Sequence, residues 1–129
     1  MVSYDIRPYA AGDEQGILAT FNRVFGEDDP SFEPRTLADW EWTYLRNPSG
    51  TRVWVAVQDG LIAAHYASQP NRVRVEGEER IFGQILDSMV HPEHRQGLKR
   101  PGLFVETARR MLDATCGPDK DLVTYGWPN

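Results

Sequence analysis

The segment from Arg80 to Asp113 decides the fold, and it consists of three consecutive pieces: Arg80-Ile-Phe-Gly-Gln-Ile-Leu-Asp-Ser-Met-Val90, His91-Pro-Glu-His-Arg-Gln-Gly-Leu-Lys-Arg-Pro-Gly102 and Leu103-Phe-Val-Glu-Thr-Ala-Arg-Arg-Met-Leu-Asp113. The first piece is apolar and bounded by charge, which predicts a strand buried on both faces. The last piece places its apolar residues on one side of a helix. The middle piece is a basic, glycine-containing loop that leads into that helix.

This loop predicts a phosphate-binding site, because it connects a strand to a helix N-terminus. Free backbone N–H groups and the positive end of the helix dipole point at such a loop. Arg95, Lys99 and Arg100 add positive charge in a chain that is acidic as a whole. The plainer interpretation is a basic loop that only caps a core helix.

Two nucleotide-binding motifs are excluded for this loop. Gly97 and Gly102 have the glycine spacing of a P-loop, but Leu103 and Phe104 follow where a P-loop needs Lys and then Ser or Thr. The dinucleotide-binding pattern Gly-x-Gly-x-x-Gly is absent as well.

Composition limits the class of protein. The chain has 129 residues, of which 40% are hydrophobic, and we expect one domain over residues 1–129. The net charge of −5 argues against nucleic acid as a general partner. A single cysteine, Cys116, allows no internal disulfide and indicates a reducing compartment. No apolar run reaches the ~18 residues of a membrane span, and the N-terminus lacks the apolar core of a signal peptide, so we expect a cytoplasmic protein without a membrane partner.

The other segments alternate between strand and helix periods, which predicts an α/β (α+β) fold with a mixed, mostly antiparallel central sheet flanked by helices. Asp13 is expected to cap the first helix, and Thr36 with Asp39 forms a capping box for the second. Asp59-Gly60 predicts a hairpin turn. The expected strands are 2–7, 53–57, 61–67, 72–75, 80–90 and 121–125; the expected helices begin after Asp13, after Thr36 and at Leu103, the first ends at Gly26, and the second turns Leu37, Trp40, Tyr44 and Leu45 to one face.

Two motifs carry a resemblance to a known family. Val90-His-Pro-Glu-His-Arg95 resembles the Val-x-Pro-x-x-Arg turn that follows the central strand in the GNAT superfamily of N-acetyltransferases. Tyr125-Gly-Trp-Pro-Asn129 resembles the Tyr-Gly-Phe-Pro-Asn that follows the fifth strand of that family. The family's pyrophosphate loop, Gln/Arg-x-x-Gly-x-Gly/Ala, has no matching register here: from Lys99 it places Phe104 last, and from Arg95 it needs an insertion.

The resemblance implies an acyl-CoA N-acyltransferase-like fold that lacks the C-terminal helix and hairpin, because the chain ends at Asn129. It implies direct transfer of an acetyl or longer acyl group from CoA to a small-molecule amine acceptor, with acetyl-CoA or another acyl-CoA as co-substrate and no metal. The alternative is a non-catalytic acyl-CoA-binding or dimerisation module. A strand at 121–125 without a further neighbour is an exposed edge, so we also expect a homo-oligomer.

The resemblance also implies which residues hold the CoA. In the family the central strand splays from its neighbour, and its free backbone N–H groups bind the pantetheine and the thioester carbonyl. The expected cofactor-binding residues are Met89, Val90 and His91 through their backbones, Arg95, Gln96, Gly97, Leu98, Lys99, Arg100, Gly102 and Leu103 in the loop, and Asn129 in the second motif.

Asp87 and Gln84 are the candidate catalytic residues. They have opposite parity along the strand, so only one faces the cleft unless a bulge intervenes, and Gly83 is a candidate for that bulge. Asp87 is the only carboxylate inside the apolar strand. Its alternative role is a hydrogen-bonded structural carboxylate, and His65 is a weaker candidate that more often occupies a core.

His91 and His94 have a spacing that metals accept, but no carboxylate or cysteine lies at a matching spacing, so we expect no metal site. Cys116 has no base beside it in the sequence that would make it a nucleophile.

Overall fold

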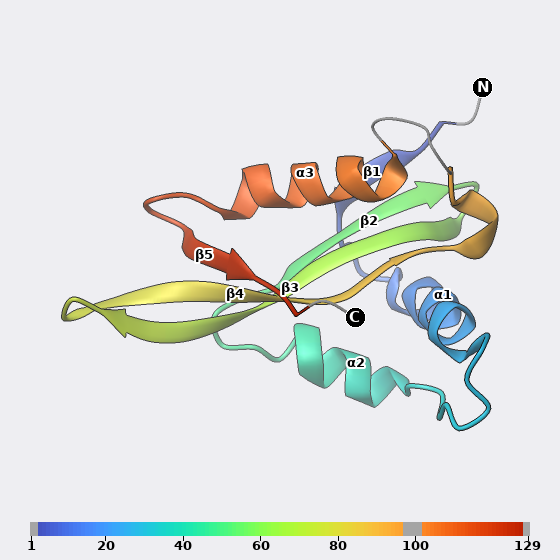
Figure 1. Ribbon diagram of the computed structural model, residues 1–129, viewed down its shortest axis with the longest axis horizontal. Helices are drawn as coiled ribbons and strands as arrows, with labels where there is room; N and C mark the ends of the chain where they lie inside the picture. Colours follow the sequence, from blue (N-terminus) through green and yellow to red (C-terminus); the bar gives the residue numbers. More distant parts are fainter. Residues whose placement is uncertain (1–2, 97–101, 128–129) are drawn as a thin grey trace.

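The computed structural model describes residues 3–96 and 102–127, in which helices cover both faces of one mixed sheet (Figure 1). In chain order the described elements are β1 (Asp5–Pro8), α1 (Glu14–Gly26), α2 (Leu37–Tyr44), β2 (Arg52–Gln58), β3 (Leu61–Val75), β4 (Glu78–Val90), the 3-10 turn η1 (Pro92–His94), α3 (Leu103–Thr115) and β5 (Asp121–Tyr125). The strand order is β1-β2-β3-β4-β5, antiparallel except for the parallel pair β4 and β5. The predicted fold class is confirmed.

The larger core lies between the sheet and the α1–α2 layer, which is below the sheet in Figure 1. Its buried residues come from α1, α2, β2, β3 and β4, and they include Ile17, Phe21, Trp40, Tyr44, Val53, Val55, Ile62 and Met89. Trp40 and Tyr44 are each 1% exposed, as the expected face of the second helix requires, whereas Leu45 lies at the surface. The Thr36–Asp39 capping box is present in both directions.

The opposite face carries α3, which packs closely because the strands beneath it present small side chains. Leu103 is buried there against Ala56, Ala63 and Ala64. Thr107 and Met111, one and two turns further along α3, are also buried. Of the predicted apolar side of this helix, Leu103 and Met111 therefore face the sheet, whereas Phe104 is 43% exposed.

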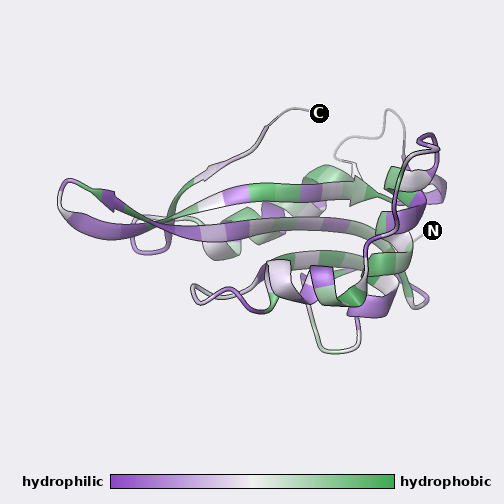
Figure 2. Cartoon of the chain, turned by 90° about the horizontal axis from the view of Figure 1, so that it is seen from below, coloured by the Kyte–Doolittle hydropathy of each residue, from purple (hydrophilic) through white to green (hydrophobic). Residues whose placement is uncertain are grey.

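The strands expected at 61–67 and 72–75 are one continuous strand, β3, which corrects the prediction of a break between them. β2 pairs with β3 only as far as Ser68, opposite Arg52, so that beyond this point one edge of β3 has no paired strand among the described residues. Pro70 has no N–H to donate and is tolerated at such an edge. The far end of the β3–β4 hairpin extends beyond the helices and is hydrophilic (Figures 1 and 2).

Three local predictions need correction. β1 begins at Asp5 rather than at residue 2 and includes Pro8. Asp13 makes no side-chain cap on α1, because its carboxylate accepts from Arg7 and from the Ala10 N–H instead. β4 is buried at Gly83 and Met89 only, because its outer half lies in the projecting hairpin and its inner half borders cavities.

Gly83 is required by a close approach and not by a bulge. It pairs in regular register with Pro70 on β3, and an added Cβ would lie 3.0 Å from the Ser68 Oγ and 3.7 Å from an Asp121 carboxylate oxygen. This space lets Asp121 at the start of β5 reach Arg52 on β2, with N–O distances of 2.9 and 3.0 Å. A bidentate ion pair thus ties β5 to the sheet.

In the part of the chain that the structure describes, no helix combines the length and the apolar character needed to span a membrane.

Candidate functional site

The site begins where β4 and β5 diverge. The parallel pairing of these strands ends at Gln84 opposite Tyr125, whereas β4 continues to Val90. The chain leaves β5 closely over Ile85, where a Cβ on Gly126 would lie 3.3 Å from the Ile85 Cβ. From Ile85 onward, β4 keeps only β3 as a paired strand among the described residues.

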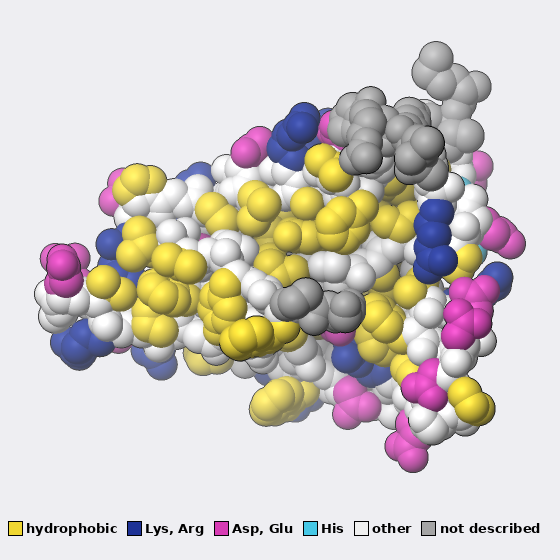
Figure 3. All heavy atoms as spheres, viewed as in Figure 1, with side chains coloured by type: hydrophobic (Ala, Val, Ile, Leu, Met, Phe, Trp, Pro, Cys, Tyr) yellow, Lys and Arg dark blue, Asp and Glu magenta, His cyan; other side chains and the backbone are white. Residues whose placement is uncertain are grey.

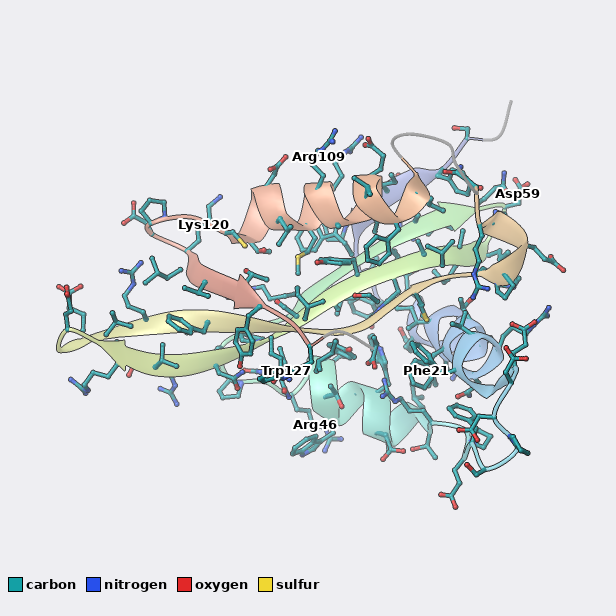
Figure 4. The ribbon with its side chains drawn as sticks, in the orientation of Figure 1. Phe21, Arg46, Asp59, Arg109, Lys120 and Trp127 are labelled. Atoms are coloured by element: carbon teal, nitrogen blue, oxygen red, sulfur yellow. The ribbon has the colours of Figure 1, made fainter. Side chains whose placement is uncertain are left out.

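A cavity of about 450 Å³ lies between the diverging strands β4 and β5, on the α3 side of the sheet. Its walls come from β3, β4, α3 and the chain at and after β5: Tyr66, Ile85, Asp87, Ser88, Phe104, Leu112, Thr124, Tyr125, Gly126 and Trp127. Hydrophobic side chains gather over this region in Figure 3. Trp127, labelled in Figure 4, is 76% exposed at its rim.

A second cavity of about 240 Å³ lies on the α1 side, where Phe25 and Leu86 form part of its wall. The two cavities have four lining residues in common: Ile85, Asp87, Ser88 and Trp127. The same short stretch of β4 therefore borders a space on each side of the sheet.

That stretch contains a bulge at Asp87 and Ser88. His65 on β3 pairs with Met89, and Ala67 pairs with Leu86. Between these two pairs β3 has one residue, Tyr66, whereas β4 has two, Asp87 and Ser88. Asp87 has a φ of 54°, in the left-handed region that few residues other than glycine adopt. The bulge expected at Gly83 lies here instead, four residues further along.

The Asp87 carboxylate lies in a network of donors from the α2 region. Its Oδ2 accepts from the Tyr44 hydroxyl at 2.5 Å and from an Arg35 guanidinium nitrogen at 2.6 Å. Its Oδ1 has a single longer contact to Arg35, at 3.4 Å. Gln84, the other candidate, lies in the paired part of β4 between Gln69 and Tyr125 and lines neither cavity.

His65 contacts the same residue from β3. Its Nδ1 is 2.9 Å from the Asp87 carbonyl oxygen, which can only accept, so Nδ1 carries the proton and Nε2 does not. Nε2 is buried without a hydrogen-bond partner in the described residues. Burial lowers the pKa of His65 below its ordinary value of 6.5, which keeps the folded imidazole neutral.

Stability is therefore expected to fall as the pH drops below about 6.5, where His65 in the unfolded chain takes up a proton that the buried imidazole does not. The contribution of the neutral His65 to the free energy of unfolding is fully present above that pH. Below it, this contribution is lost at no more than about 1.4 kcal/mol per pH unit. Urea unfolding between pH 7.5 and 5 measures it. His65→Asn keeps a donor near Nδ1 without titrating, and it should flatten this slope; an equally steep slope in the variant would contradict the assignment.

The backbone at the end of β4 offers one donor to the divergence. The His91 N–H donates to the Ala63 carbonyl at 2.8 Å, and by the alternation of an antiparallel ladder the Met89 N–H also faces β3. The Val90 N–H then faces away from β3. Of the three expected backbone donors, Val90 is therefore the one whose N–H lies on the side of β4 away from β3.

A third cavity, of about 320 Å³, lies between the end of β4 and the start of α3. Its lining includes five of the expected cofactor-binding residues: Val90, Arg95, Gln96, Gly102 and Leu103. The Gln96 side-chain oxygen accepts from the Leu103 N–H at 2.8 Å, at the helix N-terminus. Phe104 lines both this cavity and the large one. The predictions for Gly97, Leu98, Lys99, Arg100 and Asn129 lie outside the described residues.

The histidines of the turn have structural hydrogen bonds. The His91 Nδ1 accepts from the Glu93 N–H, and the His94 Nδ1 is 2.9 Å from the Tyr4 hydroxyl. Within residues 3–96 and 102–127, no group of three His, Cys, Asp or Glu side chains is arranged to hold a metal ion. Cys116 lies 2.8 Å from the Thr124 hydroxyl.

The sequence pattern did not point to Arg35, and for Tyr44 it predicted only a place on the apolar face of the second helix. Arg35 and Asp87 are separated by 52 residues, and no local pattern links them. A weak signal existed for Tyr44, because a buried tyrosine hydroxyl needs a polar partner.

Solved structures with a similar fold include proteins described as acetyltransferases and one described as a probable N-acyltransferase. Glucosamine-6-phosphate N-acetyltransferase from Arabidopsis thaliana is 14% identical with a TM-score of 0.70, over 98% of this chain and 83% of that one. A GNAT family acetyltransferase from Brucella melitensis, in complex with acetyl-CoA, is 20% identical with a TM-score of 0.65, over 88% and 69%. A probable N-acyltransferase from Enterococcus faecalis is 15% identical with a TM-score of 0.63 over 88% of this chain, which spans only 26% of that protein.

No curated protein sequence matches the chain. The sequence model of the family described as acetyltransferase (GNAT) domain matches residues 5–127, which is almost the whole chain. The chain therefore belongs to the GNAT acetyltransferase family.

Proposed function

We propose that this chain transfers an acetyl group from acetyl-CoA to an amine, with the CoA on the α3 side of β4 and the amine on the α1 side. The observation that carries this proposal is the divergence of β4 from β5, which opens two cavities onto the same residues, Asp87 and Ser88 among them. A thioester and an amine placed in the two cavities would meet at this stretch.

The proposed CoA path follows two cavities joined at Phe104. Arg95 and the N-terminus of α3 would meet the pyrophosphate, and Gln96 would give up its bond to the Leu103 N–H there. The Val90 N–H, at the inner end of this path, would donate to the thioester carbonyl as negative charge develops on its oxygen.

The proposed chemistry needs a proton acceptor beside the amine. The amine nitrogen forms a bond to the carbonyl carbon, the C–S bond breaks, and its electron pair leaves with the sulfur. Asp87 is the only ionisable side chain that lines both cavities among the described residues, and its Oδ1 is the less occupied oxygen. It would take the proton that the amine loses. We give Gln84 no part in this step.

Arg95→Ala is expected to weaken acetyl-CoA binding about tenfold, since one charge-assisted contact is worth about 1.4 kcal/mol. Isothermal titration measures it. The matched control is Arg109→Ala on the outer face of α3, whose ion pair with Glu106 is exposed.

A second titration with S-acetylpantetheine, which lacks the pyrophosphate, separates the phosphate contact from the rest of the path. Arg95→Ala should leave that affinity unchanged. Equal losses for both ligands would place the pyrophosphate elsewhere.

The alternative of a non-catalytic acyl-CoA-binding module predicts the same titrations and no transfer to any amine. Self-association also stays a proposal. It is supported by β5, which has only β4 beside it in the described residues and exposes Val123 and Tyr125.

A further inference from the structure

Asp87 is held from three directions by side chains that the proposed chemistry does not itself use. Tyr44 on α2 and Arg35, just before α2, both reach its Oδ2. His65 on β3 donates to its backbone carbonyl. A single residue at a bulge thus receives donors on its side chain and on its backbone.

Arg35 is itself fixed by α1. Its backbone N–H donates to the Asn22 side-chain oxygen at 2.9 Å, and its carbonyl accepts from the Asn22 amide at 3.4 Å. Its guanidinium lies 3.9 Å from the centre of the Phe21 ring, a cation–π contact. The backbone and the guanidinium of Arg35 are therefore held by contacts with α1 that do not involve Asp87.

Tyr44 is fixed by burial. It is 1% exposed and packs against Trp40 and edge-on against His65, with ring centroids 5.5 and 5.7 Å apart. Burial, together with the Asp87 carboxylate, raises the pKa of Tyr44, so its hydroxyl remains a donor at all working pH values.

We propose, resting on the function proposed above, that Arg35 and Tyr44 are positioning residues for Asp87. By donating to Oδ2 they hold the carboxylate and the bulge of β4 in place. The held carboxylate presents Oδ1 to the amine, and the held bulge sets the direction of the Val90 N–H. The φ of 54° at Asp87 lies in the sparsely populated left-handed region, and inside a strand it persists where packing and hydrogen bonds hold it. The donors to Oδ2 supply that constraint and leave one oxygen for the proton.

The experiment compares Tyr44→Phe and Arg35→Lys with a matched control, Arg52→Lys. Arg52 also forms a bidentate pair with a buried aspartate, but on the part of the sheet where β5 is paired. All three variants lose hydrogen bonds to a partly or fully buried carboxylate, and only the first two touch Asp87. Thermal unfolding establishes that each variant is folded.

The first readout is hydrogen exchange of the Met89 amide, which follows the bulge and bonds β3. It should accelerate at least about tenfold in Tyr44→Phe and Arg35→Lys and remain unchanged in Arg52→Lys, because local opening governs exchange. The Tyr9 amide, which bonds Val53 at the other side of the sheet, is the internal reference. Wild-type exchange at Met89 in both variants would overturn the proposal, whether or not the protein transfers acetyl groups.

The second readout is steady-state acetyl transfer. In both variants kcat should fall about tenfold or more while KM for acetyl-CoA stays within about threefold, since positioning acts on the reacting geometry. In an Asp87→Asn background, Tyr44→Phe should lower kcat no further. A fall of the same size in Arg52→Lys, or additive losses in the double variant, would overturn it. If both variants exchange faster at Met89 but the wild type transfers no acetyl group, the proposed function is rejected, whereas the positioning of Asp87 by Arg35 and Tyr44 stands.

Discussion

Asp87→Asn is expected to lower kcat for acetyl transfer by about 10²- to 10⁴-fold, the range for a lost general base. The substitution keeps the size of the side chain and an oxygen for Arg35 and Tyr44, but an amide cannot take a proton from the amine. The dissociation constant for acetyl-CoA should stay within about threefold, because the proposed pyrophosphate and carbonyl contacts come from other residues.

The control is Asp59→Asn, a second aspartate with a left-handed backbone, with a φ of 49°. Asp59 lies at the turn between β2 and β3 (Figure 4) and lines none of the three cavities. It should leave kcat unchanged. If Asp87→Asn retains the turnover of the wild type and only lowers stability, Asp87 is the structural carboxylate that the sequence also allowed.

Arg52→Ala is expected to lower the free energy of unfolding by about 3–5 kcal/mol, the usual effect of removing one partner of a buried ion pair. Asp121 is 2% exposed and has no other charged partner among the described residues, so its carboxylate would remain buried without countercharge. β5 should loosen with it, since this pair joins β5 to β2 across Ser68 and Gly83.

Urea unfolding followed by circular dichroism measures this loss. Arg72→Ala is the control, because the Arg72–Glu79 pair is exposed on the projecting hairpin at 3.9 Å, and such pairs contribute about 0–1 kcal/mol. Similar unfolding midpoints for the two variants would show that Asp121 finds another partner or that water reaches it.

The parts of the fold that the sequence predicted correctly depend on near neighbours in the chain. The capping box at Thr36 uses a residue three positions away, and the Asp59-Gly60 turn joins adjacent strands. The strand before the loop and the helix after it, β4 and α3, follow from the apolar pattern within each of these two pieces. The break expected in β3 does not occur. Pro70 is tolerated within this strand because β2 ends opposite Ser68, and the position of that end is not visible in the sequence around Pro70.

The network around Asp87 could not be predicted in the same way. Its donors, Arg35, Tyr44 and His65, come from separate elements and meet only after the sheet and α2 have packed. The bulge at Asp87 gave no glycine signal, since aspartate there adopts the conformation under tertiary constraint. Gly83, which did give that signal, is needed for a close approach.

The most direct test of this account is a ¹⁵N-edited spectrum of the protein titrated with acetyl-CoA to saturation. We predict that the largest amide shifts occur at Ser88 to Val90, at Arg95 and Gln96, and at Gly102 to Phe104, the residues along the cavities joined at Phe104. The amides of the projecting hairpin at residues 71–79 should not move. No saturable shifts, or shifts confined to residues outside these cavities, would contradict it.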